Sequence, residues 1–410
     1  MNTPNPPAAP PGATTEPGRS GPLDFTALRP VSSLDQLVFH TDDAFHMDAA
    51  SVRDVQAEHI TASFRLHFGA NDAYRQYCRR HGVDPSSVTR WEDQLRIPLV
   101  TATQFKLRDV LSCAPDDIVK ICTSSSTEGT MSRVHRDETT LSRFLGGVRT
   151  AIEELTDVLD CRCLHLGPSS EQARDLWIAY AMSIVDLMHP TENFVVDDVF
   201  HADQAIEQLS ALAGDDAPVM VLGPPIMVVR LMEAMHAADI TINGCENVLV
   251  VTAGGWKRFS GKGIARSELE QLVAGRLQGI RRESFRDCFS MVELNGLLAE
   301  CECHVKHAPP WLRLLVLKPD SLLPARDGEL GLLAFLDPTP TSYPGFVLTD
   351  DLATMREAHR CACGRFGETV DILRRVHRVE ARGCALKIDR AYGAQSGSQR
   401  ADRWTSAQTS

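Results

Sequence analysis

The sequence lacks a long hydrophobic run and a surplus of positive charge. No stretch of its 410 residues approaches the roughly 20 apolar residues of a transmembrane helix, so we expect no membrane span. Its 54 acidic residues outnumber its 42 Lys and Arg residues, which gives a formal net charge of −12. This balance disfavours a nucleic-acid partner, because binding to a phosphate backbone requires clustered cations.

A secretion signal is also missing from the first residues, which have neither a basic start nor an apolar segment. We therefore expect the protein to stay in the cytoplasm. Its twelve cysteines would be mostly reduced there. We therefore expect them to act as metal ligands, as a nucleophile or as core residues before we expect disulfides. Hydrophobic residues make up 43% and charged residues 23%, which is typical of a soluble chain with a sizeable core.

Both ends of the chain have compositions that cannot bury a core. Residues 1–22 are rich in Pro, Ala, Gly and Thr, and residues 393–410 in Gly, Ser, Gln and Thr, so we predict two disordered tails. Between them we place one large domain at 23–372 and a hinge with a short C-terminal segment at 373–392.

Helical and strand patterns alternate in the middle of the chain. The predicted helices and strands are, in order, Ala205–Ala213 (helix), Val219–Leu222 (strand), Pro225–Ala238 (helix), Val248–Thr252 (strand) and Ile264–Leu277 (helix). This order predicts an α/β fold with a largely parallel sheet. From Trp311 onward, LRLLVL, GLLAFL and GFVLT are separated by Pro, Gly and Asp turns and predict a smaller β-rich part, placed at 297–372.

A loop rich in hydroxyl groups is the first candidate for chemistry. The segment from Cys122 to Val134 reads CTSSSTEGTMSRV. Small residues and hydroxyls can surround phosphate oxygens with N–H and O–H donors. The alternative is a polar loop without a ligand.

This loop resembles the phosphate loop of adenylate-forming enzymes, (S/T)-(S/T)-G-(S/T)-T-G. The resemblance implies ATP contacts from Ser124, Ser125, Ser126, Thr127 and Gly129. Two positions depart from the pattern, because Ser126 replaces a glycine and Glu128 replaces a hydroxyl residue. A carboxylate there should repel a triphosphate unless it points away or shares a cation.

Two further segments match the same family. VVTAGGWK places Gly254 and Gly255 after a strand, where the resemblance implies that they lie beside the adenine. In DCFSMVELNG, Phe289 matches the aromatic residue near the adenine and Glu293 the carboxylate that helps to hold Mg²⁺. Ser290 replaces the usual glycine. The alternatives are a plain turn and an exposed glutamate.

The last two motifs concern the ribose and the hinge. In TSYPGFVLTDDLATM, Thr349 and Asp351 match the T-x-D unit whose carboxylate accepts both ribose hydroxyls. Arg375 matches the hinge arginine, which can reach phosphates or ribose. The alternatives are an Asp-rich turn and a basic solvated strand.

The five motifs keep the family's order over roughly residues 101–384, and TPTSYPG, ECEC and RGC make the chain most similar to the acyl-protein synthetases of bacterial luciferase systems. The resemblance implies an adenylate-forming α/β fold and an acid–thiol ligase that uses ATP and Mg²⁺. It also implies a carboxylic acid substrate, of the fatty acid class, which becomes an acyl-adenylate. The acyl group would then pass to a partner, an acyl reductase or a carrier protein.

Cys384 follows Arg382-Gly383 and matches the cysteine that looks like the acyl acceptor of these synthetases. The cation nearby would lower the pKa of the thiol. Only 26 residues follow Cys384, too few for the usual C-terminal lobe, so we expect a truncated C-terminal segment. Three alternatives stay open: a ligase that uses coenzyme A or a carrier-protein thiol, a non-catalytic descendant that binds a nucleotide or a partner, and a merely buried cysteine.

Two C-x-C pairs predict a structural zinc site. Its ligands would be Cys301, Cys303, Cys361 and Cys363, and His307 could replace one of them. Such a site would join the ends of two hairpins in the β-rich part. The alternative is a set of reduced, unpaired thiols.

Overall fold

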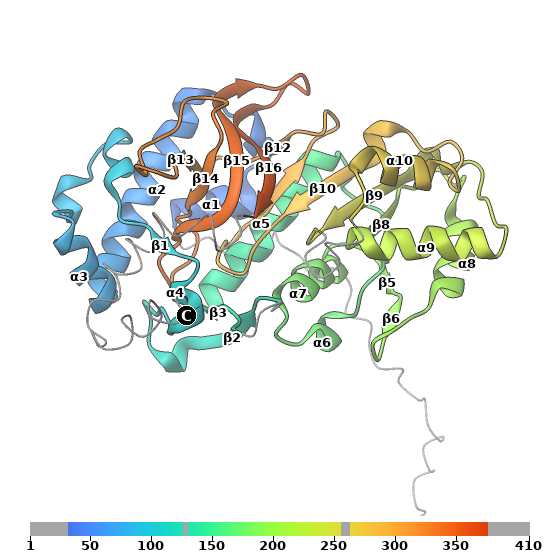
Figure 1. Cartoon of the computed structure of the whole chain (residues 1–410), viewed down its shortest axis with the longest axis horizontal. Helices are drawn as coiled ribbons and strands as arrows, with labels where there is room; N and C mark the ends of the chain where they lie inside the picture. Colours follow the sequence, from blue (N-terminus) through green and yellow to red (C-terminus); the bar gives the residue numbers. More distant parts are fainter. Residues whose placement is uncertain (1–31, 126–129, 256–262, 376–410) are drawn as a thin grey trace, which may run out of the picture.

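The computed structural model describes residues 32–125, 130–255 and 263–375 (Figure 1). The predicted tails at 1–22 and 393–410 lie outside these residues, as does most of the predicted hinge segment. None of the described helices is both long enough and apolar enough to cross a bilayer.

A twelve-stranded sheet organises the described chain, and one half of it is parallel. The parallel strands are β5 (Thr191–Asn193), β4 (Arg162–His165), β8 (Val219–Gly223), β9 (Val248–Ala253) and β10 (Phe285–Phe289). Helices α8 (Ala202–Leu212), α9 (Pro225–Ala237) and α10 (Arg266–Ala274) lie beside this half (Figure 1). The predicted strand–helix alternation is therefore confirmed, although α10 is shorter than expected because Gly275, a poor helix former, follows Ala274.

The parallel strands are buried on both faces, which explains their uninterrupted apolar sequences. Val219, Val221 and Val250 pack into a core with α8, α9 and α10. Their neighbours Met220 and Val251 point to the opposite face and join the main core. This alternation is the pattern expected of a sheet that is covered on both sides.

The β-rich part continues the same sheet in antiparallel fashion. Its strands are β11 (Leu298–Glu300), β12 (Lys306–His307), β16 (Phe366–Arg375), β15 (Phe346–Arg360), β14 (Gly331–Leu336) and β13 (Arg313–Leu317). The GFVLT segment, which predicted a short strand, is the beginning of the fifteen-residue strand β15. This strand pairs with β16 as one long hairpin, and the two halves of the sheet meet where β11 pairs with β10.

Helices from the N-terminal third cover the antiparallel half (Figure 1). They are α1 (Ser33–His40), α2 (Ala49–Ala70), α3 (Asp72–Arg80) and α4 (Gln104–Leu107), with the long α5 (Glu138–Thr156) behind them. A buried ion pair of 2.6 Å between Arg143 Nε and an Asp35 carboxylate oxygen joins α5 to α1. Gly146 lets the two helices approach, because a Cβ atom there would lie 2.4 Å from the Phe39 ring.

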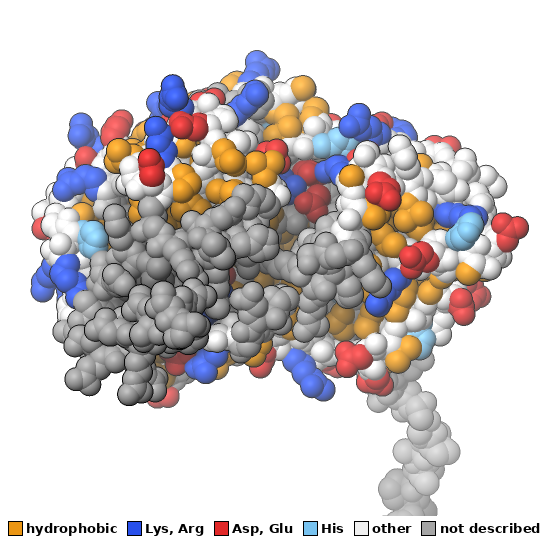
Figure 2. Space-filling view, in the orientation of Figure 1, with side chains coloured by type: hydrophobic (Ala, Val, Ile, Leu, Met, Phe, Trp, Pro, Cys, Tyr) orange, Lys and Arg blue, Asp and Glu red, His pale blue; other side chains and the backbone are white. Residues whose placement is uncertain are grey.

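The remaining elements are short. β1 (Val100–Thr101) is the twelfth strand of the sheet and pairs in parallel with β15. Outside this sheet lie β2 (Ile118–Thr123), β3 (Arg133–Asp137), α6 (Ser170–Ala173), α7 (Trp177–Ser183), β6 (Val195–Val196) and β7 (Val199–Phe200). Figure 2 shows acidic and basic side chains interspersed over the described part of one face, so neither sign of charge dominates it.

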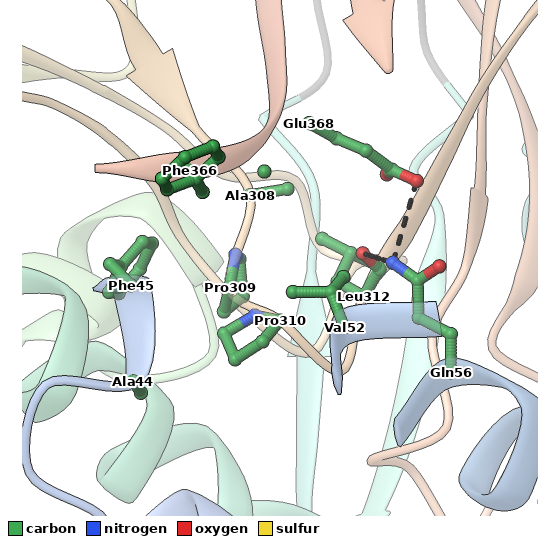
Figure 3. Close-up of a pocket in the computed structure, with 11 residues that line it drawn as sticks. Ala44, Phe45, Val52, Gln56, Ala308, Pro309, Pro310, Leu312, Phe366 and Glu368 are labelled. Carbon is green, nitrogen blue, oxygen red and sulfur yellow. Dashed lines mark hydrogen bonds between the residues drawn. The ribbon is translucent and has the colours of Figure 1, made fainter. Parts of the chain in front are cut away.

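A hollow between α2 and the start of β16 contains a buried carboxyl group, that of Glu368 (Figure 3). Glu368 accepts hydrogen bonds from the Leu314 amide and from Gln56 Nε2. Gln56 also donates to the Leu312 carbonyl and accepts from Trp91. Since these polar groups are engaged with one another, we interpret the hollow as a packing seam. Burial raises the pKa of Glu368 to about 8.

This raised pKa predicts a stability that depends on pH. The folded chain holds the Glu368 proton more tightly than the unfolded chain, whose carboxyl has its ordinary pKa of 4.5. The contribution of this proton to the free energy of unfolding is therefore fully present below about pH 4.5. It is lost as the pH rises towards 8, by up to about 1.4 kcal/mol per pH unit. We expect Glu368→Gln to flatten the decline of the free energy of unfolding between pH 5 and pH 8, as measured by urea denaturation. Parallel pH profiles of the two proteins would contradict the assignment.

Candidate active site

The predicted phosphate loop lies at the tip of the β2–β3 hairpin. Ser124 closes the base of the tip, because its amide donates to the Ser132 carbonyl and its Oγ accepts from the Ser132 amide, each at 3.0 Å. Ser125 follows it within the described chain, whereas Ser126, Thr127, Glu128 and Gly129 lie outside it. The base of the hairpin tip is thus closed by Ser124 and Ser132.

The segment 175–178, which we call the α7 entry, holds the hairpin in place. The Thr123 amide donates to the Asp175 carbonyl at 2.7 Å, and Thr123 Oγ1 donates to the same oxygen at 3.1 Å. Thr123 also forms an isolated parallel bridge with Leu176. The end of β2 is therefore attached to the start of α7.

The paired glycines after β9 contact the same segment. Gly254 and Gly255 both have left-handed backbones, with φ of +86° and +57°. A Cβ atom on Gly254 would lie 2.7 Å from Cγ1 of Ile178, so a larger residue would collide with the α7 entry. Beside this turn lies an open hollow with about 660 Å³ of space, open solvent included, whose lining includes Thr252, Gly255 and Asp287. Trp256 and Lys257 lie outside the described residues.

The loop that carries Glu293 follows β10 and also reaches the α7 entry. Phe289 ends the strand with a half-buried ring, and Glu293 is buried. The Ser290 hydroxyl donates to the Gly296 carbonyl at 3.0 Å and accepts from Trp177 Nε1 at 3.3 Å. The serine that replaces the family's glycine therefore closes this loop and binds it to α7.

A buried polar network that sequence analysis missed fixes the other side of the Glu293 loop. The backbone amide of Asn295 donates to Asp337 Oδ2 at 3.0 Å, and its side-chain Nδ2 donates to the Thr140 carbonyl at 2.8 Å. Arg136 donates to the Val292 carbonyl at 2.8 Å and to Asn295 Oδ1 at 3.3 Å. Burial raises the pKa of Asp337, and its hydrogen bonds oppose this shift. The only signal in the sequence was Asp337 itself, a carboxylate at the end of an apolar strand.

The ribose motif lies on β15. Thr349 Oγ1 donates to the Leu333 carbonyl at 2.8 Å and accepts from the Asp351 amide at 3.0 Å. Asp351 is buried, and its pairing partner on β16 is Arg375. The long hairpin therefore brings the ribose motif and the hinge position opposite each other, although the Arg375 side chain lies outside the described part. Cys384 also lies outside it.

A second cluster, of sulfur and nitrogen ligands, occupies two hairpin turns. The ligand atoms of Cys301, His307, Cys361 and Cys363 all lie within 4.8 Å of one another. Cys301 Sγ is 3.8 Å from Cys361 Sγ, and Cys363 Sγ is 3.7 Å from His307 Nε2. Two thiolates at 2.3 Å from a tetrahedral zinc ion would be about 3.8 Å apart, so these spacings fit such an ion. Cys303 is exposed and lies outside this group.

The two turns that supply the cysteines have the same backbone pattern. The Cys301 amide donates to the Val305 carbonyl, and the amide of His304 donates back to the Cys301 carbonyl. Cys361 makes the equivalent pair of bonds with Arg365 and Gly364. The fourth residue of each turn is left-handed, with φ of 59° at His304 and 91° at Gly364. Burial raises the pKa of the Cys301 thiol to about 12, so the metal-free thiol keeps its proton.

Comparisons with known proteins identify the family of the chain. The family model of the LuxE acyl-protein synthetases matches residues 20–393. The chain is 31% identical over 359 residues to a long-chain-fatty-acid–luciferin-component ligase of Aliivibrio fischeri, covering 87% of this chain and 93% of the relative. The ligase of the same name from Vibrio harveyi is 32% identical over 339 residues, covering 82% and 88%.

A solved structure supports the fold. An open conformation of 2-hydroxyisobutyryl-CoA ligase superimposes with a TM-score of 0.64 at 15% sequence identity, covering 87% of this chain and 81% of that protein. The predicted adenylate-forming α/β fold is thereby confirmed. The chain belongs to the LuxE acyl-protein synthetase family and is a ligase.

Proposed function

We propose that this ligase activates a carboxylic acid of the fatty acid class with ATP and then forms a thioester. One observation carries the proposal. The phosphate hairpin, the paired glycines and the Glu293 loop all contact the α7 entry, through Thr123, Gly254 and Ser290. Three family motifs that are far apart in the sequence are therefore attached to one four-residue segment, as a shared nucleotide site requires.

In the first half-reaction a carboxylate oxygen of the acid attacks the α-phosphorus of ATP. The bond to the bridging oxygen breaks, pyrophosphate leaves, and an acyl-adenylate remains. Ser124, Ser125 and the rest of the loop would donate hydrogen bonds to the phosphates, and Glu293 would hold the Mg²⁺ that offsets their charge. Asp351 would accept both ribose hydroxyls, while Phe289 and the backbone of Gly254 and Gly255 would flank the adenine.

In the second half-reaction a thiolate attacks the acyl carbonyl and AMP leaves with the electron pair of the broken bond. We assign the thiolate to Cys384, with Arg375 at the hinge. The thioester would then pass to a partner, an acyl reductase or a carrier protein. The names of the two relatives, which both specify a luciferin component, support a protein acceptor. The alternative is direct transfer to coenzyme A or a carrier-protein thiol.

We also propose that the cluster of Cys301, His307, Cys361 and Cys363 binds a structural Zn²⁺. Three thiolates and an imidazole complete a closed tetrahedral set. Arg365 is buried beside Cys363 and forms ion pairs with Glu302 and Asp157, so a cation lies near the thiolates. Ten residues of extended strand separate Cys361 from Asp351, roughly 30 Å. The proposed zinc therefore has a structural role.

Glu293→Gln tests the first half-reaction. We expect ATP–pyrophosphate exchange, dependent on Mg²⁺ and a fatty acid, to fall by roughly 100-fold or more, because a carboxamide is a poor Mg²⁺ ligand. Glu233→Gln, an exposed position on α9, serves as the control and should keep full exchange. Undiminished exchange in Glu293→Gln would remove Glu293 from the mechanism, and no exchange in the wild-type protein with any acid would favour a non-catalytic descendant.

Cys384→Ser tests the acceptor. We expect this variant to keep acid-dependent exchange but to lose the covalent, hydroxylamine-sensitive label that a radioactive fatty acid leaves on the wild-type protein in the presence of ATP. Cys113→Ser, at a partly exposed cysteine, should retain the label. Label that persists in Cys384→Ser would place the thioester elsewhere, and rapid release of acyl-coenzyme A would favour the alternative ligase.

Metal analysis tests the zinc site. We expect about one zinc ion per chain in the wild-type protein and in Cys303→Ser, because Cys303 lies outside the ligand group. Cys361→Ser should lose the ion and melt at a lower temperature, since a structural site contributes directly to folding. If Cys303→Ser loses the ion and His307→Ala keeps it, the four-cysteine set is the correct one.

A further inference from the structure

A guanidinium group with an unused donor lies behind the Glu293 loop. Arg136, on β3, is completely buried and stacks on Trp177, with Cζ 3.8 Å from the ring centroid. Both acceptors of its hydrogen bonds, the Val292 carbonyl and Asn295 Oδ1, are neutral. Its Nη1 atom has no hydrogen-bond partner in the described structure. A buried positive charge is thus held without a hydrogen-bonded carboxylate.

A second unused donor lies next to it. Tyr343 belongs to the TPTSYPG segment and is completely buried, with its ring centroid 5.9 Å from Arg136 Cζ. Its hydroxyl also lacks a partner among the described residues. Burial raises the pKa of Tyr343, so this hydroxyl keeps its proton and is available as a donor.

Two unsatisfied buried donors in one place are costly. Each donor has lost its hydration without gaining an acceptor, and the cost is larger when the donor is charged. The Asp337 carboxylate does not relieve this cost, because its oxygens accept from Asn295 and Thr339. An incoming acceptor with two oxygens and a negative charge would satisfy Nη1 and the hydroxyl together.

The surroundings favour a carboxylate over a polyphosphate. Trp177, Tyr343 and Phe144 make the neighbourhood aromatic, with the rings of Phe144 and Trp177 4.4 Å apart. The thiol of Cys122, also buried, lies against the guanidinium. A triphosphate carries several charges and needs a cation, whereas a fatty acid carries one charge on an apolar chain. Val292, which accepts from Arg136, directly precedes Glu293, so an acid held here would lie beside the proposed reaction centre.

We propose that Arg136 Nη1 and the Tyr343 hydroxyl bind the carboxylate of the acid substrate before its activation. This inference rests on the proposed function for the class of the substrate. It does not require adenylation to occur, because binding of the acid precedes any reaction with ATP. Arg136 would thereby distinguish an acid from an uncharged molecule of the same chain length.

The test compares dodecanoate with dodecanol in calorimetric titrations of the full chain without ATP. We expect the wild-type protein to bind the acid more tightly than the alcohol by roughly 10-fold to 100-fold, as for a hydrogen-bonded charged group. Arg136→Gln should abolish this preference and leave the affinity for the alcohol unchanged. Tyr343→Phe removes only the unpartnered hydroxyl, so it should fold normally and reduce the preference partially.

Arg313→Gln is the matched control. Arg313 is also buried and stacks on an aromatic ring, 3.4 Å from the Trp91 centroid, but it bonds to Trp91 and Gln94. Its loss should leave the acid preference intact. Equal binding of acid and alcohol to the wild-type protein, or an undiminished preference in Arg136→Gln and Tyr343→Phe, would overturn the proposal. Weaker ATP binding in Arg136→Gln, with acid binding unchanged, would also overturn the proposal, because the Arg136 guanidinium would then bind a phosphate of ATP.

The two proposals fail in distinguishable ways. A wild-type chain that prefers dodecanoate but catalyses no pyrophosphate exchange would reject adenylation and retain the carboxylate site. A chain that exchanges pyrophosphate but shows no role for Arg136 in acid preference would do the reverse.

Discussion

The stacking of the Arg136 guanidinium on Trp177 is the contact on which the candidate site depends. It joins β3, the second strand of the phosphate hairpin, to the first residue of α7. The same arginine donates to the Val292 carbonyl and to Asn295 Oδ1, which lie on either side of Glu293, and the same tryptophan donates to Ser290. This one pair therefore contacts the loop before and after Glu293. Arg136 and Trp177 are both buried, and both hold the loop that carries Glu293. A small shift of either residue would therefore move Glu293.

This construction also explains how the chain tolerates one departure from the family pattern. A serine at position 290 would be an unsatisfied hydroxyl in a buried loop if nothing met it. Here the hydroxyl donates to the Gly296 carbonyl and accepts from Trp177, so it is satisfied. These two hydrogen bonds hold the loop closed. The serine side chain therefore shapes this turn through its hydrogen bonds.

Sequence patterns predicted the strands whose formation depends on local residue type. They did not predict the features that depend on contacts between distant parts of the chain. The runs VMVL and VLVVT predicted parallel strands because strands buried on both faces are apolar throughout. The full length of β15 was not predictable, since its second half reads as a charged, solvated segment. The roles of Arg136 and Asn295 were not predicted, because each lies up to 159 residues from its hydrogen-bond partner in the sequence. A local sequence pattern does not indicate such a contact.

The same distinction applies to the proposed metal cluster. C-x-C pairs predict a pair of turns, but the choice between Cys303 and His307 depends on how β12 lies against β16, where His307 pairs with Thr369. Pairing of β15 with β16 shifts register twice, between Leu352 and Ala353 and between Arg356 and His359. A one-residue slip would turn Asp351 to the opposite face. A metal ion that binds Cys301 and His307 together with Cys361 and Cys363 would fix the closed end of this hairpin and, through it, the position of Asp351 opposite Arg375.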